Sequence, residues 1–266
     1  MIEIPRSGTA QIVVEGRRLE LRDLDRPLWP VAGLTKADLL DYYVRVAPLF
    51  MPYVLGRPLR VVRFPDGVHL RGVVESDYPP VTGLPSLLEL VDLAAVEFHV
   101  PLGPPAGVLF EIDAGAGRGL EDCCAVALKL RELLVGDGLV SHVKTSGAFG
   151  LHVLVPLNGG ADEAAAREYA RTAAERVATA EPDLVTADAR RTSRAGRVLL
   201  DWRPNAPQRT TVAPWSMRAM LPGPGVSAPV SWRDVEMGTL ERSPRDIFTF
   251  VDHWRMVHES VQRLPG

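Results

Sequence analysis

The stretch Gly107-Val108-Leu109-Phe110-Glu111-Ile112-Asp113 decides the fold, because it predicts an apolar strand that ends in two acids. Side chains at positions i and i+2 of a strand point to the same face, so the carboxylates of Glu111 and Asp113 converge on one point. Two hard cations about 3.5–4 Å apart need such oxygen ligands, usually with a third carboxylate. Asp201 is the candidate third ligand, because it ends the apolar run Val198-Leu199-Leu200. The alternative is that these strand-end acids face solvent or pair with arginines.

A second motif, Lys144-Thr145-Ser146-Gly147-Ala148-Phe149-Gly150-Leu151-His152, predicts a glycine-containing turn between two strands. Its glycines let the backbone approach an anion closely and leave N–H groups available to a phosphate. Lys144 and Ser146 add a positive charge and a hydroxyl, and His152 lies at the start of the second strand. The alternative is an ordinary turn followed by a buried histidine. The nucleophile-elbow pattern G-x-S-x-G is absent, which disfavours a serine hydrolase. The dinucleotide-binding pattern G-x-G-x-x-G is absent as well.

A third feature is the segment 190–218, which contains seven arginines and a single acid, Asp201. This local excess of positive charge is a candidate phosphate-binding surface, and a solvated arginine face is the alternative. The interleaved polar residues suited to nucleotide contacts are Asn205, Gln208, Thr210 and Ser216.

Helices and strands are predicted without regular βαβ alternation, which favours an α+β fold over a doubly wound sheet. Two strands joined by a turn at Glu15-Gly16 are expected within 9–22, and further strands over 57–64, 107–113, 141–144, 151–156, 197–202 and 210–213. A helix is expected to begin at Thr35, with Asp38 completing its capping box. Other helices are expected over 86–97, 120–134, 162–179 and 244–264. The interpretation is one domain over 1–266, with an N-terminal lobe (1–105), a catalytic sheet lobe (106–235) and a C-terminal helix (236–266).

Composition limits the classes of function. The chain has 266 residues, 46% of them hydrophobic, and a formal net charge of -3. This charge disfavours a polycation that coats nucleic acid, but it allows a local basic channel. No apolar run approaches the roughly 20 residues that span a bilayer, and the N-terminus is unlike a secretory signal. The two cysteines, Cys123 and Cys124, are adjacent, which excludes a disulfide framework and a cysteine-based zinc site. A cytoplasmic protein without a membrane partner is expected.

Taken together and in this order, the motifs resemble the polymerase domain of bacterial end-joining DNA ligases of the ligase D type. The resemblance covers roughly residues 20–235. Its matching runs are Leu24–Pro30, Thr35–Leu39, Gly56–Pro58, Arg63–Gly67, Leu93–His99, Val108–Gly115, Lys144–His152, Arg197–Asn205 and Thr211–Arg218. The resemblance implies an archaeo-eukaryotic primase-type fold, in which an RNA-recognition-like β-sheet packs with a second α/β unit.

The resemblance also implies a function. A ribonucleotide-preferring primase-polymerase would extend a 3′-OH on a template in DNA gap filling or end joining, using nucleoside triphosphates. By motif position, the catalytic residues Glu111, Asp113 and Asp201 would hold two Mg²⁺ or Mn²⁺ ions. The implied nucleotide contacts are Lys144, Thr145, Ser146, Gly147, His152, His99, Gln208, Ser216 and Arg218. The implied DNA contacts are Arg26, Lys36 and Arg63, of which Arg26 and Lys36 match positions that hold a 5′-phosphate. A separate DNA ligase and a Ku-type end-binding protein are the implied partners.

The sequence departs from the family's pattern in two places. Glu111 stands where the family usually has Asp, and its extra methylene moves the carboxylate by about 1 Å, where Mg²⁺ demands near-ideal geometry. Between Gly67 and Leu93 the segment with paired aromatic residues is missing. Base stacking on an aromatic side chain contributes about 1–3 kcal/mol per base, so template binding should be weaker. These departures motivate two alternatives: a non-polymerising accessory protein that binds nucleotides or DNA ends, and a metal-dependent phosphoester hydrolase.

Overall fold

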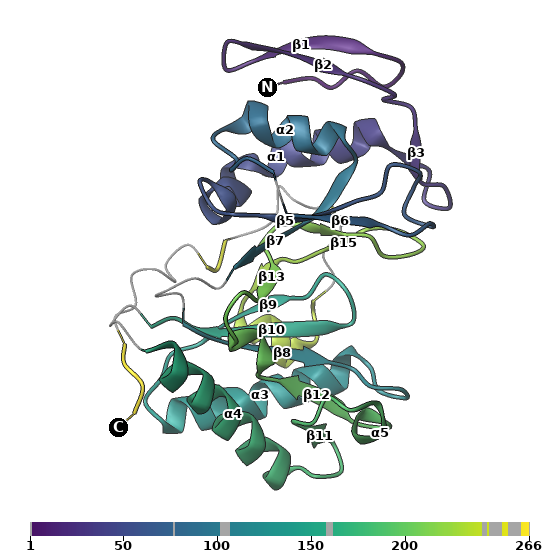
Figure 1. Ribbon diagram of the computed structural model, residues 1–266. Helices are drawn as coiled ribbons and strands as arrows, with labels where there is room; N and C mark the ends of the chain where they lie inside the picture. The colour runs from purple at the N-terminus through teal and green to yellow at the C-terminus, as the bar shows by residue number, and fades with distance from the viewer. Residues whose placement is uncertain are drawn as a thin grey trace. The chain divides into compact units, whose positions relative to one another are not determined.

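The computed structural model describes residues 2–76, 78–101, 107–157, 162–240, 244, 252–254 and 262–265 (Figure 1). The chain divides into two compact units, whose main segments are Met1–Val100 with Val212–Ser227 and Pro101–Thr211 with Ala228–Glu241. The first break lies near the expected lobe boundary at 105. Residues 212–227, however, belong to the first unit and not to the catalytic sheet lobe as expected. Most of the expected C-terminal helix over 244–264 lies outside the described residues.

The first unit is built around a sheet with the strand order β13-β7-β5-β6. Its helices are α1 (Lys36–Val54) and α2 (Leu84–Asp92). Its strands are β1 (Ala10–Val14), β2 (Arg17–Leu21), β3 (Pro27–Trp29), β4 (Leu34–Thr35), β5 (Arg60–Arg63), β6 (Val73–Glu75), β7 (Ala95–Pro101), β14 (Met217–Arg218) and β15 (Gly225–Val226). At β13 (Thr210–Val212) the chain passes from the second unit into the first. The predicted hairpin within 9–22 is confirmed as the β1–β2 pair.

Helix α1 begins where its capping residues predict. The Asp38 carboxylate accepts hydrogen bonds from the backbone N–H of Thr35 at 2.8 Å and from its hydroxyl at 3.0 Å. These bonds satisfy donors that the first helical turn would otherwise leave unpaired. Further along the same helix, Tyr43 and Phe50 pack their rings against Phe98 of β7, with centroids 5.1 and 5.4 Å apart. The apolar stripe of α1 thus fixes the position of β7.

The predicted helix over 86–97 is wrong in its second half. Helix α2 ends at Asp92, and Ala94 has a positive φ of 61°, which a continuing helix does not allow. Residues Ala95–Pro101 instead form β7, in which buried side chains alternate with partly exposed ones. The apolar residues and alanines up to Val96 fit both the spacing of a helix and the alternation of a strand. The segment forms a strand because it pairs with β5.

The second unit contains a six-stranded sheet with the order β11-β12-β8-β10-β9-β16, in which only the β11–β12 pair is parallel. Its strands are β8 (Val108–Asp113), β9 (His142–Thr145), β10 (Gly150–Val155), β11 (Val185–Thr186), β12 (Val198–Asp201) and β16 (Pro229–Val230). Its helices are α3 (Leu120–Gly136), α4 (Glu163–Ala180), α5 (Arg191–Arg194), the 3₁₀ turn η1 (Arg203–Asn205) and α6 (Trp232–Met237).

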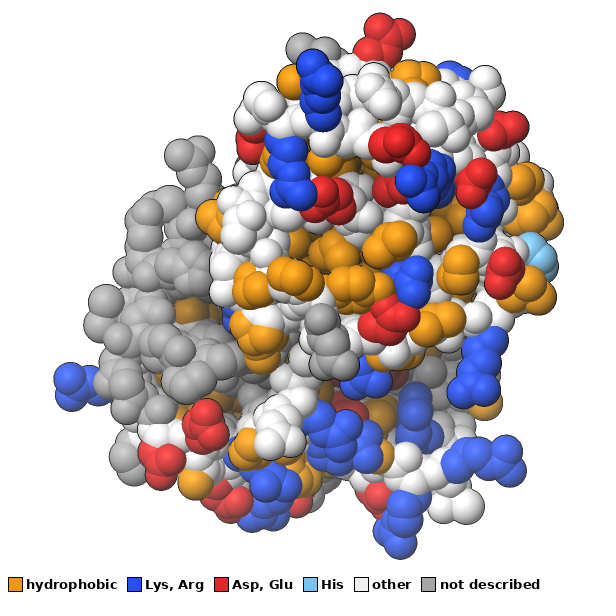
Figure 2. All heavy atoms as spheres, turned by 45° about the horizontal axis from the view of Figure 1, so that its top comes forward, with side chains coloured by type: hydrophobic (Ala, Val, Ile, Leu, Met, Phe, Trp, Pro, Cys, Tyr) orange, Lys and Arg blue, Asp and Glu red, His pale blue; other side chains and the backbone are white. Residues whose placement is uncertain are grey.

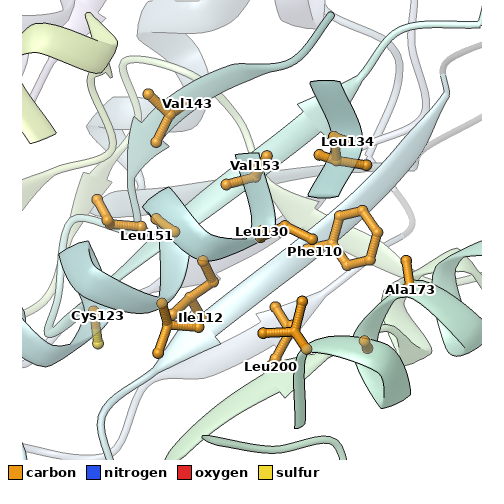
Figure 3. Packing of buried hydrophobic residues seen from close by; sticks show 14 of the residues in the cluster. Phe110, Ile112, Cys123, Leu130, Leu134, Val143, Leu151, Val153, Ala173 and Leu200 are labelled. Carbon is orange, nitrogen blue, oxygen red and sulfur yellow. The ribbon is translucent and has the colours of Figure 1, made fainter. Parts of the chain in front are cut away.

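Alternate residues of the second sheet face the hydrophobic core. Phe110 and Ile112 of β8, Leu151 and Val153 of β10 and Leu200 of β12 pack against side chains of α3 and α4 (Figure 3). Because the side-chain period of a strand is two, Glu111, His152 and Asp201 point to the other face of the sheet. The buried core therefore fixes which residues are available for chemistry. Overall, the mixed α+β class predicted from the sequence is confirmed.

Candidate functional site

A row of polar side chains crosses four neighbouring strands of the second unit. Asp201 of β12 is the register partner of Glu111 of β8, Glu111 is the partner of His152 of β10, and His152 is the partner of Lys144 of β9. Directly opposite residues of an antiparallel pair lie on the same face with Cβ atoms about 4.5–5.5 Å apart. The strand pairing thereby brings together Glu111 and Asp201, which are 90 positions apart in the chain. The register thus places the two acids opposite each other on neighbouring strands.

Asp113 extends this row along β8, two residues beyond Glu111 on the same face. Its register partner is Gly150, at which a Cβ atom would lie 2.1 Å from the Ile112 carbonyl oxygen and 3.1 Å from Asp113 Oδ1. Only glycine therefore fits at position 150. The missing side chain lets the turn before β10 lie directly against the Asp113 carboxylate.

Thr211 joins two members of the row. Its hydroxyl donates to Glu111 Oε1 at 3.0 Å and lies 3.1 Å from His152 Nδ1. A hydroxyl has one proton to donate, so the geometry assigns a proton on Nδ1 of His152, donated to the Thr211 oxygen. The other ring nitrogen, Nε2, lies 3.8 Å from Glu111 Oε1. Sequence reasoning missed this role of Thr211, because nothing in a short Thr-Thr-Val strand distinguishes a bridging hydroxyl.

The electrostatic environment of Glu111 is acidic. Burial raises the pKa of its carboxyl, and the nearby charges of Asp113 and Asp201 raise it further, while the Thr211 hydrogen bond and the Lys144 charge lower it. A desolvated carboxylate with two acidic neighbours is stabilised by a cation placed among them. Carboxylate oxygens are also the donors that Mg²⁺ and Mn²⁺ prefer. The donor chemistry of Glu111, Asp113 and Asp201 therefore fits a divalent cation.

Asp201 is engaged by an arginine. Arg203 donates from Nε to Asp201 Oδ1 at 2.8 Å and from Nη2 to Oδ2 at 2.5 Å, and its backbone N–H donates to Oδ1 at 2.9 Å. The alternative considered from the sequence, that a strand-end acid pairs with arginine, thus applies to Asp201. Among the described residues no group of three or more His, Cys, Asp or Glu side chains is arranged closely enough to hold a metal ion. Arg203 therefore competes with any cation for the Asp201 carboxylate.

Glu111 and Asp201 open onto a cavity of about 220 Å³. The other lining residues are Arg203, Pro204, Arg209 and Thr210. Arg209 adds a cation to a cavity whose floor is acidic. Gln208, an expected nucleotide contact, is exposed and lies in the preceding turn with a φ of 62°. The Asn205 side chain instead bonds to the backbone of Leu109, which ties η1 to β8.

The turn between β9 and β10 is rigidly held. The Ser146 hydroxyl oxygen accepts from the backbone N–H groups of Ala148 and Gly150, both at 3.1 Å, and Gly147 has a φ of 74°. Thr145 is joined to Ala228 by the backbone and by its hydroxyl. Lys144 and His152 are 1% and 4% exposed, respectively. The turn is therefore preorganised, and its expected anion-binding side chains lie at the buried end of the row.

The first unit contains a separate group of expected nucleotide contacts. Glu97 Oε2 lies 3.1 Å from His99 Nε2 and 3.1 Å from Arg218 Nε, and Oε1 accepts from the Ala219 backbone N–H at 3.0 Å. Burial would raise the pKa of Glu97, but the His99 hydrogen bond, the Arg218 charge and the Ala219 amide lower it to about 2. Glu97 was missed because the sequence placed it at the end of a helix.

Ser216 does not fit the expected nucleotide contact. Its side chain has no exposed surface, and its hydroxyl accepts from the Phe98 backbone N–H at 2.9 Å and donates to the Met217 carbonyl at 3.0 Å. These bonds join β7 to β14. The Ser216 hydroxyl is thus a structural link that holds Arg218 beside β7.

The three expected DNA contacts differ in their surroundings. Arg26 is 41% exposed, pairs with Asp23 and lines a cavity of about 410 Å³. Lys36 is 5% exposed, and its ammonium is 2.8 Å from Asp92 Oδ1. Arg63 is clamped by Glu75 through two nitrogens, at 3.0 and 2.6 Å. Only Arg26 is therefore presented to the surface as a DNA phosphate contact requires.

The basic segment 190–218 is partly neutralised. Three of its arginines form ion pairs: Arg190 with Asp188, Arg203 with Asp201, and Arg218 with Glu97. Arg191 and Arg194 line an open cavity of about 730 Å³. On the face shown in Figure 2, Lys and Arg side chains are numerous in the lower part, and Asp and Glu side chains are interspersed with them there and in the upper part. No helix among the described residues is long and apolar enough to cross a membrane.

Comparison with known proteins assigns the family. The model of the LigD primase-polymerase domain matches residues 35–80 and 71–259. The chain belongs to this family. It is 32% identical over 248 residues to the multifunctional non-homologous end joining protein LigD of Mycolicibacterium smegmatis, and 26% identical over 243 residues to the bifunctional LigD of Bacillus subtilis. It spans only 32% and 40% of the lengths of these relatives, and each match covers 82% of this chain.

A solved structure agrees with this assignment. The polymerase domain from Mycobacterium tuberculosis ligase D, determined in complex with DNA, superimposes with a TM-score of 0.83 at 29% sequence identity. The match covers 92% of this chain and 99% of that domain. The primase-type fold implied by the sequence motifs is therefore confirmed, and the family is that of the polymerase component of end-joining DNA repair proteins.

Proposed function

We propose that this chain transfers nucleotides from nucleoside triphosphates to a DNA 3′-OH, under the direction of a template, during gap filling or end joining. The observation that carries the proposal is the row Asp201, Glu111, His152 and Lys144 on one face of one sheet, with Asp113 beside it. Acids for cations and a lysine and histidine for an anionic substrate occur there side by side. Phosphoryl transfer depends mainly on such positioning and charge stabilisation.

In this proposal Glu111, Asp113 and Asp201 would hold two Mg²⁺ or Mn²⁺ ions. When bound, such ions lower the pKa of an attacking hydroxyl and neutralise the charge of a triphosphate. The chain's own residues orient the substrate. Lys144 and the turn at Gly147 bind phosphate oxygens, and Thr211 fixes the His152 ring so that Nε2 faces the acidic row. His99 and Arg218 in the first unit would contact the sugar and the triphosphate.

In this proposal Arg203 pairs with the Asp201 carboxylate when no cation is bound. The Arg203 guanidinium bonds to both oxygens of Asp201 and so competes with a cation for that carboxylate. The Arg203 side chain is 47% exposed and Asp201 only 12%, so Arg203 can leave for solvent when a cation takes over the charge of the mostly buried carboxylate. The same ion pair is the observation that favours the second candidate function, a nucleotide- or DNA-end-binding protein that does not polymerise.

DNA binding in this proposal depends on few contacts. Arg26 is the surface cation that would hold a 5′-phosphate across a gap. The Lys36 backbone N–H donates to the Arg26 carbonyl at 2.9 Å, while the Lys36 side chain forms a buried pair with Asp92. The missing aromatic segment between Gly67 and Leu93 removes base stacking. A Ku-type protein would therefore contribute to end binding, and a separate DNA ligase is the other proposed partner.

Primer extension tests the proposal. The purified protein should add ribonucleotides to the 3′-OH of a gapped duplex with Mn²⁺, and Asp113→Asn should reduce the rate by at least about 100-fold. Glu175→Gln on α4, which loses only an exposed pair with Arg171, is the matched control and should retain the rate of the parent protein. Binding of nucleoside triphosphate without incorporation, with either metal, would support the non-polymerising candidate. Shortening of the primer would instead indicate hydrolysis.

A further inference from the structure

Glu97 lies among the cations of the first unit but has no role in the function proposed above. Its strand neighbours Val96 and Phe98 point into the core, so Glu97 and His99 share the other face of β7. Ser216 fixes β14 to this strand, and Arg218 follows two residues later. The local fold therefore places Glu97 between a histidine and an arginine.

The Glu97 carboxylate is fully engaged. One oxygen faces both His99 Nε2 and Arg218 Nε, each at 3.1 Å, and the other accepts from the Ala219 amide at 3.0 Å. Only 12% of the Glu97 side chain is exposed, against 20% for His99 and 24% for Arg218. Glu97 is thus more buried than His99 and Arg218, whose side chains are more accessible from solvent.

We infer that Glu97 is a positioning residue for nucleotide binding, which holds His99 and Arg218 in the orientation that receives the anionic triphosphate and its sugar. This inference rests on the function proposed above. Arginine binds phosphate through a planar fork, so a guanidinium already held in an ion pair with Glu97 loses less rotational freedom when the phosphate binds. Preorganisation of this kind raises affinity without adding a contact.

The charge of Glu97 allows a sharp test. A carboxylate near a triphosphate repels it, so a role limited to charge predicts that Glu97→Gln binds nucleotide more tightly. A positioning role predicts the opposite, because glutamine is nearly the same shape but cannot hold Arg218 by charge. We expect the KM for nucleoside triphosphate to rise about tenfold in Glu97→Gln, while kcat at saturating nucleotide changes less than threefold.

Three further variants complete the experiment. Glu97→Asp keeps the charge but withdraws it by one methylene, and it should raise KM to an intermediate value. Glu89→Gln removes an exposed pair with Arg17 in the same unit and should leave both constants unchanged. In a His99→Ala, Arg218→Ala background, Glu97→Gln should change KM less than twofold, since the groups it positions are absent.

The outcomes separate this inference from the proposed function. Extension by the parent protein together with an unchanged or lower KM in Glu97→Gln would overturn the role of Glu97 alone. A loss of kcat with unchanged KM would overturn it too. Absence of both extension and nucleotide binding in the parent protein would overturn the proposed function itself. If Glu97→Gln does not fold, the KM of Glu97→Asp decides by the same criteria.

Discussion

Thr211→Val tests how the acidic row is held together. The substitution keeps the branched shape of the side chain but replaces its hydroxyl with a methyl group. Glu111 then loses the hydrogen bond that Thr211 donates at 3.0 Å, and His152 Nδ1 loses its partner at 3.1 Å. The His152 side chain is only 5% exposed and that of Glu111 24%, so water can replace the lost hydroxyl only in part.

The expected cost follows from the charge on Glu111. A hydrogen bond to a charged group contributes about 1.5–3 kcal/mol, so the free energy of unfolding should fall by about that amount at pH 8. Burial, the largest effect, raises the pKa of the Glu111 carboxyl, and loss of the Thr211 donor raises it further. A carboxyl with a raised pKa contributes stability that is present below its unfolded pKa and is lost as pH rises through its folded pKa. In Thr211→Val the folded pKa of Glu111 is raised further, so more of this free energy of unfolding is lost as pH rises. The difference in stability between the parent protein and the variant therefore grows with pH.

Denaturant unfolding of the metal-free protein in EDTA, between pH 5 and pH 8, measures this deficit. Thr211→Ser keeps a hydroxyl and should recover most of the stability at pH 8. Thr179→Val, which removes an exposed hydroxyl bonded to the Glu175 carbonyl on α4, is the matched control and should show no pH-dependent deficit. A Thr211→Val deficit that is the same at pH 5 and pH 8, or no deficit at all, would refute the hydrogen bond to an ionised Glu111.

Three other substitutions probe the remaining parts of the account. Arg203→Gln should bind Mn²⁺ several-fold more tightly than the parent protein in a titration, since Asp201 is no longer paired; weaker binding would show that Arg203 does not compete with the cation. Lys36→Ala should lower the free energy of unfolding by about 3 kcal/mol, because the mostly buried Asp92 carboxylate loses its ion pair with Lys36 and retains the hydrogen bond from the Arg22 backbone N–H. A melting temperature equal to the parent's would contradict this. Gly150→Ala should destabilise the protein by more than about 2 kcal/mol, because its Cβ would overlap the Ile112 carbonyl, and normal stability would show that β8 and β10 can separate there.

The parts of the fold with strong local signals could be predicted from the sequence. Helix α1 follows from the Thr35–Asp38 capping box and its apolar spacing, and the face shared by Glu111 and Asp113 follows from the period of a strand. Strand β7 could not be predicted in the same way, because Leu93 to Val96 suits either a helix or a strand. Its conformation depends on pairing with β5 and on ring packing from α1, which are contacts distant in sequence.

The candidate site, like the fold, could be predicted from the sequence only in part. The sequence identified the acids and the turn, and the register across β12, β8 and β10 then brought Asp201 and His152 to Glu111. It did not identify Thr211, Arg203 or Glu97, because each acts on a neighbour through side-chain geometry that residue type does not encode. Ser216 was misread for the related reason that a polar residue in a motif can serve the backbone and not a ligand.

Whether Glu111, Asp113 and Asp201 form a cation site is measured by the number of Mn²⁺ ions bound per chain in the presence of a non-hydrolysable nucleoside triphosphate. The parent protein should bind two ions, Asp113→Asn should bind clearly fewer, and Glu175→Gln should bind as many as the parent. A parent protein that binds nucleotide but no Mn²⁺, or an Asp113→Asn variant that binds as many ions as the parent, would contradict the claim that these carboxylates form a cation site.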